Sequence, residues 1–122
     1  MTAPLGDLTS LAAALSHLAA TIDARAGGDR DSSYTAKLLH GGPVACAKKI
    51  AEEGGELALA IAAEGPLETA SEAADLFYHI LVGLRARGVS LDDVAAILAK
   101  RQGQSGLAEK AARSQTRQAP ED

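Results

Sequence analysis

The sequence has 122 residues, which fits one domain, and 47% of them are hydrophobic, enough for a packed core. Aromatic residues make up only 2% and alanine occurs 27 times, a composition that favours helices and argues against base-stacking nucleic-acid modules. The net charge of −4 disfavours a polyanionic partner, and the single cysteine, Cys46, excludes an internal disulfide. Because no apolar run approaches the roughly 18 residues of a membrane span, we expect a cytoplasmic protein with no nucleic-acid or membrane partner.

The first third of the chain predicts one long and one short helix. Leucines at helical spacing indicate a helix over residues 8–25, which a glycine pair ends. A polar connection follows over residues 29–33, and residues 34–39 favour a short helical turn. The Gly-Gly-Pro sequence at 41–43 ends that turn, and its proline suits the first turn of the next helix.

The middle of the chain predicts two long helices, over residues 43–63 and 67–87, joined by Gly65-Pro66. Gly54-Gly55 lies inside the first of them and is locally unfavourable for a helix, by roughly 1 kcal/mol per glycine. The second is apolar nearly all round from residue 73 to residue 84, which implies burial on most sides.

A fourth main helix is expected to open at Ser90, because a serine followed three residues later by Asp93 forms a variant of the capping box. A last short helix is expected over residues 107–114, and residues 116–122 have the composition of a disordered tail. We therefore expect a single all-α domain over residues 1–115.

Short connections predict an antiparallel helical bundle of four main helices. Three companions in so small a chain leave part of the third main helix uncovered. We therefore expect homodimerisation to complete the bundle, with Leu76, Ile80 and Leu84 in the dimer core.

Acidic residues on the two central helices carry the functional information: Glu52, Glu53, Glu56, Glu72 and Asp75. At about 100° per residue, Glu53 and Glu56 share one stripe of their helix. Glu72 and Asp75 share a stripe of the next helix in the same way. An antiparallel hairpin brings the two stripes face to face.

A solvated acidic face is the ordinary interpretation of such residues, but it fits Asp75 poorly because apolar residues surround it in the sequence. Four converging carboxylates would also raise one another's pKa values. A hard divalent cation, Mg²⁺ or Mn²⁺, resolves both problems, since oxygen ligands suit it. Such a site indicates phosphate chemistry.

Four segments carry a family resemblance: Ser33-Tyr34-Thr35-x-Lys37-Leu38, Lys48-Lys49-Ile50-x-Glu52-Glu53-x-x-Glu56, Glu72-Ala73-Ala74-Asp75-Leu76-x-Tyr78-His79 and Ser105-Gly106-Leu107-x-Glu109-Lys110. The acidic pattern resembles the MazG-like all-α nucleoside triphosphate pyrophosphohydrolase superfamily. The Tyr-Thr and Asp-Leu-x-Tyr-His segments narrow the resemblance to the phosphoribosyl-ATP pyrophosphatase family of histidine biosynthesis. The resemblance covers residues 8–113, and Gly54-Gly55 departs from the family pattern without removing a carboxylate.

The resemblance implies Mg²⁺-dependent hydrolysis of phosphoribosyl-ATP to phosphoribosyl-AMP and pyrophosphate. The metal ligands are then expected to be Glu53, Glu56, Glu72 and Asp75. Glu52 and Glu53 are the expected catalytic residues. Glu52 points about 100° away from Glu53 on the helix, so it is expected to position or deprotonate the water, or to hold a second metal.

The expected substrate-binding residues are Tyr34, Thr35, Lys37, Lys48 and Lys49. For the lysines the alternative is simple solvation, and for the Tyr-Thr pair it is a packed tyrosine beside a capping threonine. Tyr78 and His79 are expected to surround the metal ligands. His79 lies one turn beyond Asp75, where it either hydrogen-bonds that carboxylate or is a satisfied core histidine.

Two other functions remain open from the sequence. A house-cleaning pyrophosphohydrolase acting on ordinary or damaged nucleoside triphosphates would share the metal site and differ in its base and ribose contacts. A non-enzymatic helical interaction module would carry the same acids as surface residues. Substrate choice distinguishes a house-cleaning pyrophosphohydrolase from the phosphoribosyl-ATP pyrophosphatase family. Mg²⁺-dependent pyrophosphate release distinguishes an enzyme from a non-enzymatic module.

Overall fold

The computed structural model describes residues 2–102 and 106–118, and every regular element in that part of the chain is an α-helix. The all-α prediction is therefore confirmed. The chain forms two compact units, Met1–Val89 and Ser90–Asp122. The helices are α1 (Thr9–Arg25), α2 (Tyr34–His40), α3 (Gly42–Ala63) and α4 (Pro66–Arg87) in the first unit, and α5 (Leu91–Arg101) and α6 (Gly106–Gln118) in the second. None of the described helices is long and apolar enough to span a membrane.

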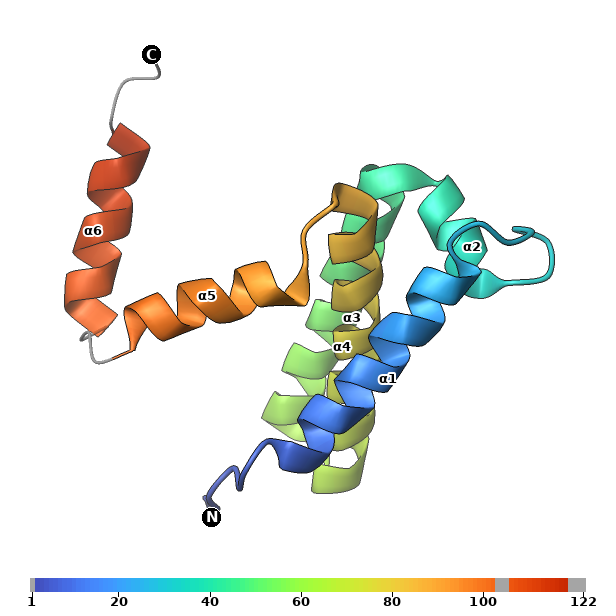
Figure 1. The fold of residues 1–122 in the computed structure, drawn as a ribbon. Coiled ribbons are helices and arrows are strands. Elements are labelled where there is room, and N and C mark those ends of the chain that lie inside the picture. Colours follow the sequence, from blue (N-terminus) through green and yellow to red (C-terminus); the bar gives the residue numbers. More distant parts are fainter. Residues whose placement is uncertain (1, 103–105, 119–122) are drawn as a thin grey trace. The chain divides into compact units, whose positions relative to one another are not determined.

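The centre of the first unit is an antiparallel hairpin of α3 and α4, against which α1 and α2 pack (Figure 1). Each hairpin helix has a proline in its first turn, where the missing N–H group costs nothing. The two-residue connection at Glu64 and Gly65 has extended backbone. This short link fixes which faces of α3 and α4 meet, as the sequence predicted.

Two glycines make the corner between α2 and α3. A Cβ on Gly41 would lie 2.7 Å from the Ala45 Cβ, so no larger residue fits there without movement. Gly42 has a φ of +78°, a left-handed conformation that other residues rarely adopt. The corner lets α2 fold back beside the start of the hairpin.

A glycine also ends α4. Gly88 has a φ of +77°, and its N–H donates to the Arg85 carbonyl at 3.2 Å. The Val89 N–H donates to the Leu84 carbonyl at 2.9 Å, which completes a Schellman motif. The predicted end of this helix at Gly88 is confirmed.

The second unit begins with the predicted capping box. The Asp93 N–H donates to Ser90 Oγ at 3.1 Å, and the Ser90 N–H donates to Asp93 Oδ2 at 3.0 Å. The last helix, α6, is longer than the expected 107–114 and includes residues 116–118 of the segment expected as a tail. The remainder of that segment, residues 119–122, lies outside the described residues.

The core lies where the four helices of the first unit meet. It contains Ile22, Leu38, Cys46, Leu81 and Val82. The seven-residue α2 contributes Leu38 to this core, so it is anchored despite its short length. Along α4 only His79, Leu81 and Val82 are fully buried, and one chain therefore leaves much of this apolar helix partly exposed.

Candidate functional site

The hairpin brings three of the four expected metal ligands together. Glu53, Glu56 and Glu72 each offer a carboxylate oxygen, and these oxygens lie within 4.8 Å of one another. Glu53 and Glu56 stand one helical turn apart on α3, and Glu72 faces them from α4. We call these three residues the acidic cluster.

The surroundings of Glu72 disfavour the charged form of its carboxyl. Its Oε2 atom is buried and has no hydrogen-bond partner among the described residues. Loss of water around the carboxyl raises the pKa of Glu72, and the neighbouring carboxyl of Glu56 and the negative charges of Asp75 and Glu53 raise it further. A buried, unpaired acceptor facing two further carboxylates fits a hard cation with oxygen ligands.

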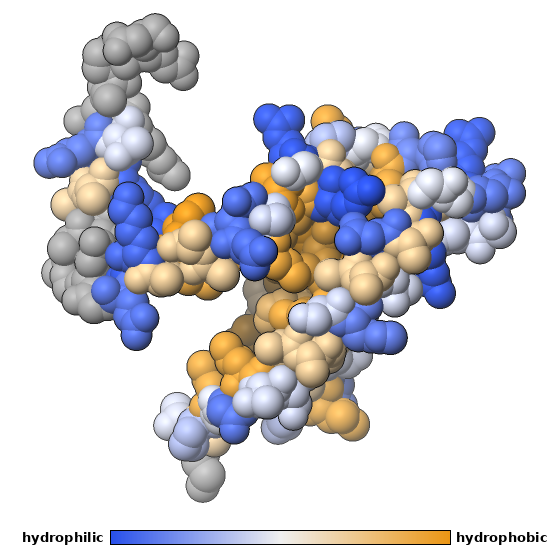
Figure 2. All heavy atoms as spheres, viewed as in Figure 1, coloured by the Kyte–Doolittle hydropathy of each residue, from blue (hydrophilic) through white to orange (hydrophobic). Residues whose placement is uncertain are grey.

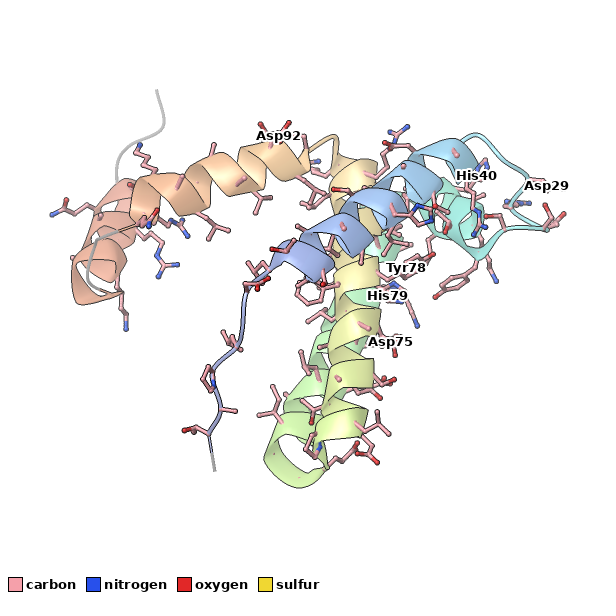
Figure 3. All side chains as sticks on the ribbon, turned by 60° about the horizontal axis from the view of Figure 1, so that its bottom comes forward. Asp29, His40, Asp75, Tyr78, His79 and Asp92 are labelled. Atoms are coloured by element: carbon pink, nitrogen blue, oxygen red, sulfur yellow. The ribbon has the colours of Figure 1, made fainter. Side chains whose placement is uncertain are left out.

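Asp75, the fourth expected ligand, is exposed and does not belong to the acidic cluster. It lies close enough for its charge to raise the pKa of Glu72. Figure 3 shows Asp75 on the same side of α4 as His79. Its role as a ligand stays a prediction.

Lys49 connects the acidic cluster to Glu52. Its Nζ lies 3.0 Å from Glu52 Oε2 and 3.8 Å from Glu53 Oε1. The hydrogen bond to Glu52 is the main reason why the pKa of Lys49 is raised. Glu52 is 60% exposed and Glu53 only 13%, so the two neighbouring carboxylates differ in environment, as their 100° separation on the helix predicts.

His79 is buried, and the nearest carboxylate to it is that of Glu53. His79 Nε2 lies 3.9 Å from Glu53 Oε1, whereas the sequence suggested Asp75 as its partner. Burial lowers the pKa of His79, and the charge of Lys49 acts in the same direction against the opposing effect of Glu53. At neutral pH the imidazole is therefore a neutral neighbour of Glu53.

Aromatic rings connect α2 to this region. The Tyr34 ring stacks with Tyr78 at a centroid distance of 6.4 Å and meets His79 edge-on at 6.1 Å. Thr35 is 3% exposed, and its hydroxyl shares a 2.6 Å hydrogen bond with the Tyr78 hydroxyl. Tyr34 is 51% exposed and free to meet a ligand, while the Thr35 hydroxyl has Tyr78 as its partner.

The remaining expected substrate contacts are two surface lysines. Lys48 is exposed on α3. Lys37 is exposed on α2 and lines a cavity together with Arg30, Asp31, His40 and Gly41. Among the described residues, neither lysine forms an ion pair with the acidic cluster, whereas Lys49 does.

Sequence reasoning missed Arg30, Asp31 and His40, which were assigned no site. His40 Nε2 lies 3.4 Å from the Gly28 carbonyl oxygen, a contact between residues 12 apart that no local pattern encodes. The ion pair of Lys49 with Glu52 was also missed. Its signal was present, because residues at i and i+3 are neighbours on a helix.

Comparisons with known proteins place this arrangement in a family. The family described as phosphoribosyl-ATP pyrophosphohydrolase matches residues 15–102. A phosphoribosyl-ATP pyrophosphatase of Ruegeria pomeroyi is 58% identical over 99 residues, which are 81% of this chain and 94% of the relative. One from Caulobacter sp. strain K31 is 57% identical over 106 residues, 87% of this chain and 98% of the relative. The chain belongs to the phosphoribosyl-ATP pyrophosphohydrolase family.

Proposed function

We propose that this chain hydrolyses phosphoribosyl-ATP to phosphoribosyl-AMP and pyrophosphate, the second step of histidine biosynthesis, and that Mg²⁺ is required. The observation that carries the proposal is the acidic cluster with its buried, unpaired Glu72 oxygen. The activity named for the relatives supports the same reaction.

The donor set of the acidic cluster favours Mg²⁺ among common metals. It offers carboxylate oxygens and no cysteine, and three carboxylates leave positions for water and substrate phosphate, which Mg²⁺ usually retains. We assign Glu53, Glu56 and Glu72 as ligands. Asp75 is the proposed fourth ligand, because its charge already acts on Glu72.

When bound, Mg²⁺ would neutralise charge on the triphosphate and favour in-line attack by water. The chain's own residues hold the reacting groups in place. His79 lies beside Glu53, with its Nε2 atom 3.9 Å from Glu53 Oε1, and we assign it the positioning of that ligand. Glu52 stands outside the acidic cluster, held by Lys49 at 3.0 Å, and we assign it the positioning of the attacking water.

The proposed substrate contacts begin at Tyr34, whose half-exposed ring meets His79 edge-on beside the acidic cluster. Lys49 and Lys48, both on α3, are proposed to meet phosphate oxygens. Thr35 acts on the substrate through Tyr78 and the packing of α2, because its hydroxyl is bonded to that tyrosine.

The test is pyrophosphate release from phosphoribosyl-ATP with and without Mg²⁺, compared with ATP, dCTP and dUTP. We expect Mg²⁺-dependent release that is fastest for phosphoribosyl-ATP. Glu56→Gln and Asp75→Asn should each remove activity while the fold is retained. Glu64→Gln, which neutralises an exposed acid just beyond the end of α3, is the matched control and should retain it.

Turnover like that of the wild type in Glu56→Gln or Asp75→Asn at saturating Mg²⁺ would overturn the ligand assignment. Equal kcat/KM values for ATP and phosphoribosyl-ATP would instead indicate a house-cleaning pyrophosphohydrolase with the same metal site. The two results are distinguishable because one concerns the metal and the other the substrate.

We further propose that the functional form is a homodimer. Leu76, Ile80 and Leu84 on α4 are only partly buried in one chain. Leu59 and Ile61 on α3 are each 67% exposed, and Figure 2 shows apolar surface over the region where Figure 1 draws the lower ends of α1, α3 and α4. A second copy of the same hairpin would cover such surface. Sedimentation at micromolar concentration should give a dimer, and a folded monomer would refute the proposal.

A further inference from the structure

A cavity lies beside α2, apart from the acidic cluster. It has a volume of about 520 Å³ and is lined by Arg30, Asp31, Lys37, His40 and Gly41, which we call the α2 pocket. The volume is within the range of small-ligand sites, about 300–1,000 Å³. No residue of the acidic cluster lines it, so it would bind a different part of a ligand.

The wall of the α2 pocket is held by local hydrogen bonds. The Asp31 N–H donates to Asp29 Oδ1 at 2.9 Å, which forms a turn around Arg30. His40 Nε2 lies 3.4 Å from the Gly28 carbonyl and ties the end of α2 to the start of this loop. The loop therefore presents Arg30 on a defined backbone before any ligand binds.

The side chains of the α2 pocket combine two cations with one carboxylate. Arg30 and Lys37 suit a phosphate monoester, because a guanidinium offers paired N–H donors and an ammonium a compact charge. Asp31 suits sugar hydroxyls, since carboxylates accept hydrogen bonds from ribose. Together these groups match a 5-phosphoribosyl group.

The α2 helix connects this pocket to the acidic cluster. At its first residue, the Tyr34 ring lies 6.1 Å from His79, whose Nε2 is 3.9 Å from Glu53 Oε1. His40 is six residues further along α2, a rise of about 9 Å. Figure 3 shows His40 near the loop that carries Asp29, and His79 on α4 between Tyr78 and Asp75. A nucleotide that lies along α2 would have its two ends near Tyr34 and His40.

We propose that the α2 pocket binds the phosphoribosyl group that the substrate carries on its adenine, with the remote phosphate on Arg30 and Lys37 and the ribose hydroxyls on Asp31. The inference rests on the proposed function for the identity of that group. Binding at a remote, non-reacting group can be used to orient the triphosphate at the acidic cluster. The pocket would therefore determine the preference for phosphoribosyl-ATP over ATP.

The first test is a thermodynamic cycle that removes the remote phosphate of the substrate and the pocket cations, singly and together. We would measure kcat/KM for phosphoribosyl-ATP and for the same compound without its remote 5-phosphate, in the wild type, Arg30→Ala and Lys37→Ala. Each variant should reduce the ratio of the two values by about tenfold, the scale of a lost charged hydrogen bond. Lys100→Ala, outside the pocket, is the charge-matched control and should keep the ratio. An unchanged ratio in both pocket variants would overturn the proposal.

The second test does not depend on turnover. Ribose 5-phosphate would be titrated into the metal-free protein with EDTA present, and binding followed by NMR and calorimetry. We expect shifts at residues 30–41 and at least fivefold weaker binding to Arg30→Ala. Such binding without any hydrolysis of phosphoribosyl-ATP would refute the proposed function and support the pocket. Hydrolysis without ribose 5-phosphate binding, or binding unaffected by Arg30→Ala, would refute the pocket alone.

Discussion

The hydrogen bond between Thr35 and Tyr78 gives the sharpest test of how α2 is held against α4. Thr35 is 3% exposed, and its Oγ1 lies 2.6 Å from the Tyr78 hydroxyl. Tyr78→Phe would leave the buried threonine hydroxyl without its partner. Thr35→Val keeps the side-chain shape and leaves the hydroxyl of Tyr78, a residue that is less buried than Thr35. The two substitutions should therefore differ in cost.

The size of the effect follows from burial. A buried group that loses its partner costs about 1–3 kcal/mol, so Tyr78→Phe should lower the free energy of unfolding by about 1–2 kcal/mol. For a unit of this size, each kcal/mol lowers the melting temperature by about 4–8 °C. Thr35→Val should cost about 0.5–1 kcal/mol. The double variant leaves neither hydroxyl unpaired, so it should be more stable than additivity predicts by about 1 kcal/mol.

Urea denaturation of the four proteins, followed by circular dichroism at one protein concentration, measures this coupling. Tyr34→Phe is the control, because the exposed ring of Tyr34 should make the substitution neutral within about 0.5 kcal/mol. A coupling below about 0.3 kcal/mol would be within the error of additivity. That result would refute the conclusion that this hydrogen bond anchors α2.

Three further predictions concern the acidic cluster and its surroundings. Glu72→Gln should raise the melting temperature of the metal-free protein at pH 7 and reduce its response to Mg²⁺. Because the pKa of Glu72 is raised in the folded protein, the wild type loses stability as pH rises and this carboxyl ionises. The extra stability of Glu72→Gln over the wild type should therefore vanish below about pH 4.3, where the carboxyl is protonated. A stability difference that is unchanged at pH 4 would contradict this cause. Gly54→Ala and Gly55→Ala should each stabilise the protein by about 0.5–1 kcal/mol in urea, because a Cβ at either position meets no described atom within 4 Å; destabilisation would contradict that open environment. The wild type should prefer phosphoribosyl-ATP over ATP by at least about 100-fold in kcat/KM, on the order of 3 kcal/mol. Tyr34→Ala should reduce this ratio of kcat/KM values by a larger factor than it weakens Mg²⁺ binding. Steady-state kinetics measures the ratio, and metal titration measures the Mg²⁺ affinity.

Local sequence signals predicted the helices well. Proline at the start of α3 and α4, Gly88 at the end of α4 and the Ser90–Asp93 capping box act within a few residues, so each is visible in the sequence. The acidic cluster also followed from local signals, because three-residue spacing and a short link determine which faces of a hairpin meet. The end of α6 was not predicted, since its last residues carry no stop signal before Gln118.

Contacts between residues far apart in the sequence could not be predicted from helical spacing and local motifs. Thr35 and Tyr78 are 43 residues apart, and their hydrogen bond depends on how α2 folds back after the Gly41-Gly42 corner. Asp75 illustrates the same limit on the hairpin itself. Helical spacing places it on the stripe of Glu72, but the crossing of α3 and α4 decides which turn of that stripe meets Glu53 and Glu56.

The α2 pocket and the acidic cluster, which we propose bind two phosphate-bearing parts of one substrate, differ in charge, and this difference favours one direction of binding. The acidic cluster repels any phosphate that arrives without a cation, so only a triphosphate with bound Mg²⁺ suits it. Arg30 and Lys37 are proposed to bind a bare phosphate monoester, which needs no metal there. The reversed orientation would place a phosphate monoester against three carboxylates, one of which has a buried oxygen without a hydrogen-bond partner among the described residues. Removing Mg²⁺ should therefore abolish productive binding of the triphosphate at the acidic cluster while leaving ribose 5-phosphate binding in the α2 pocket intact.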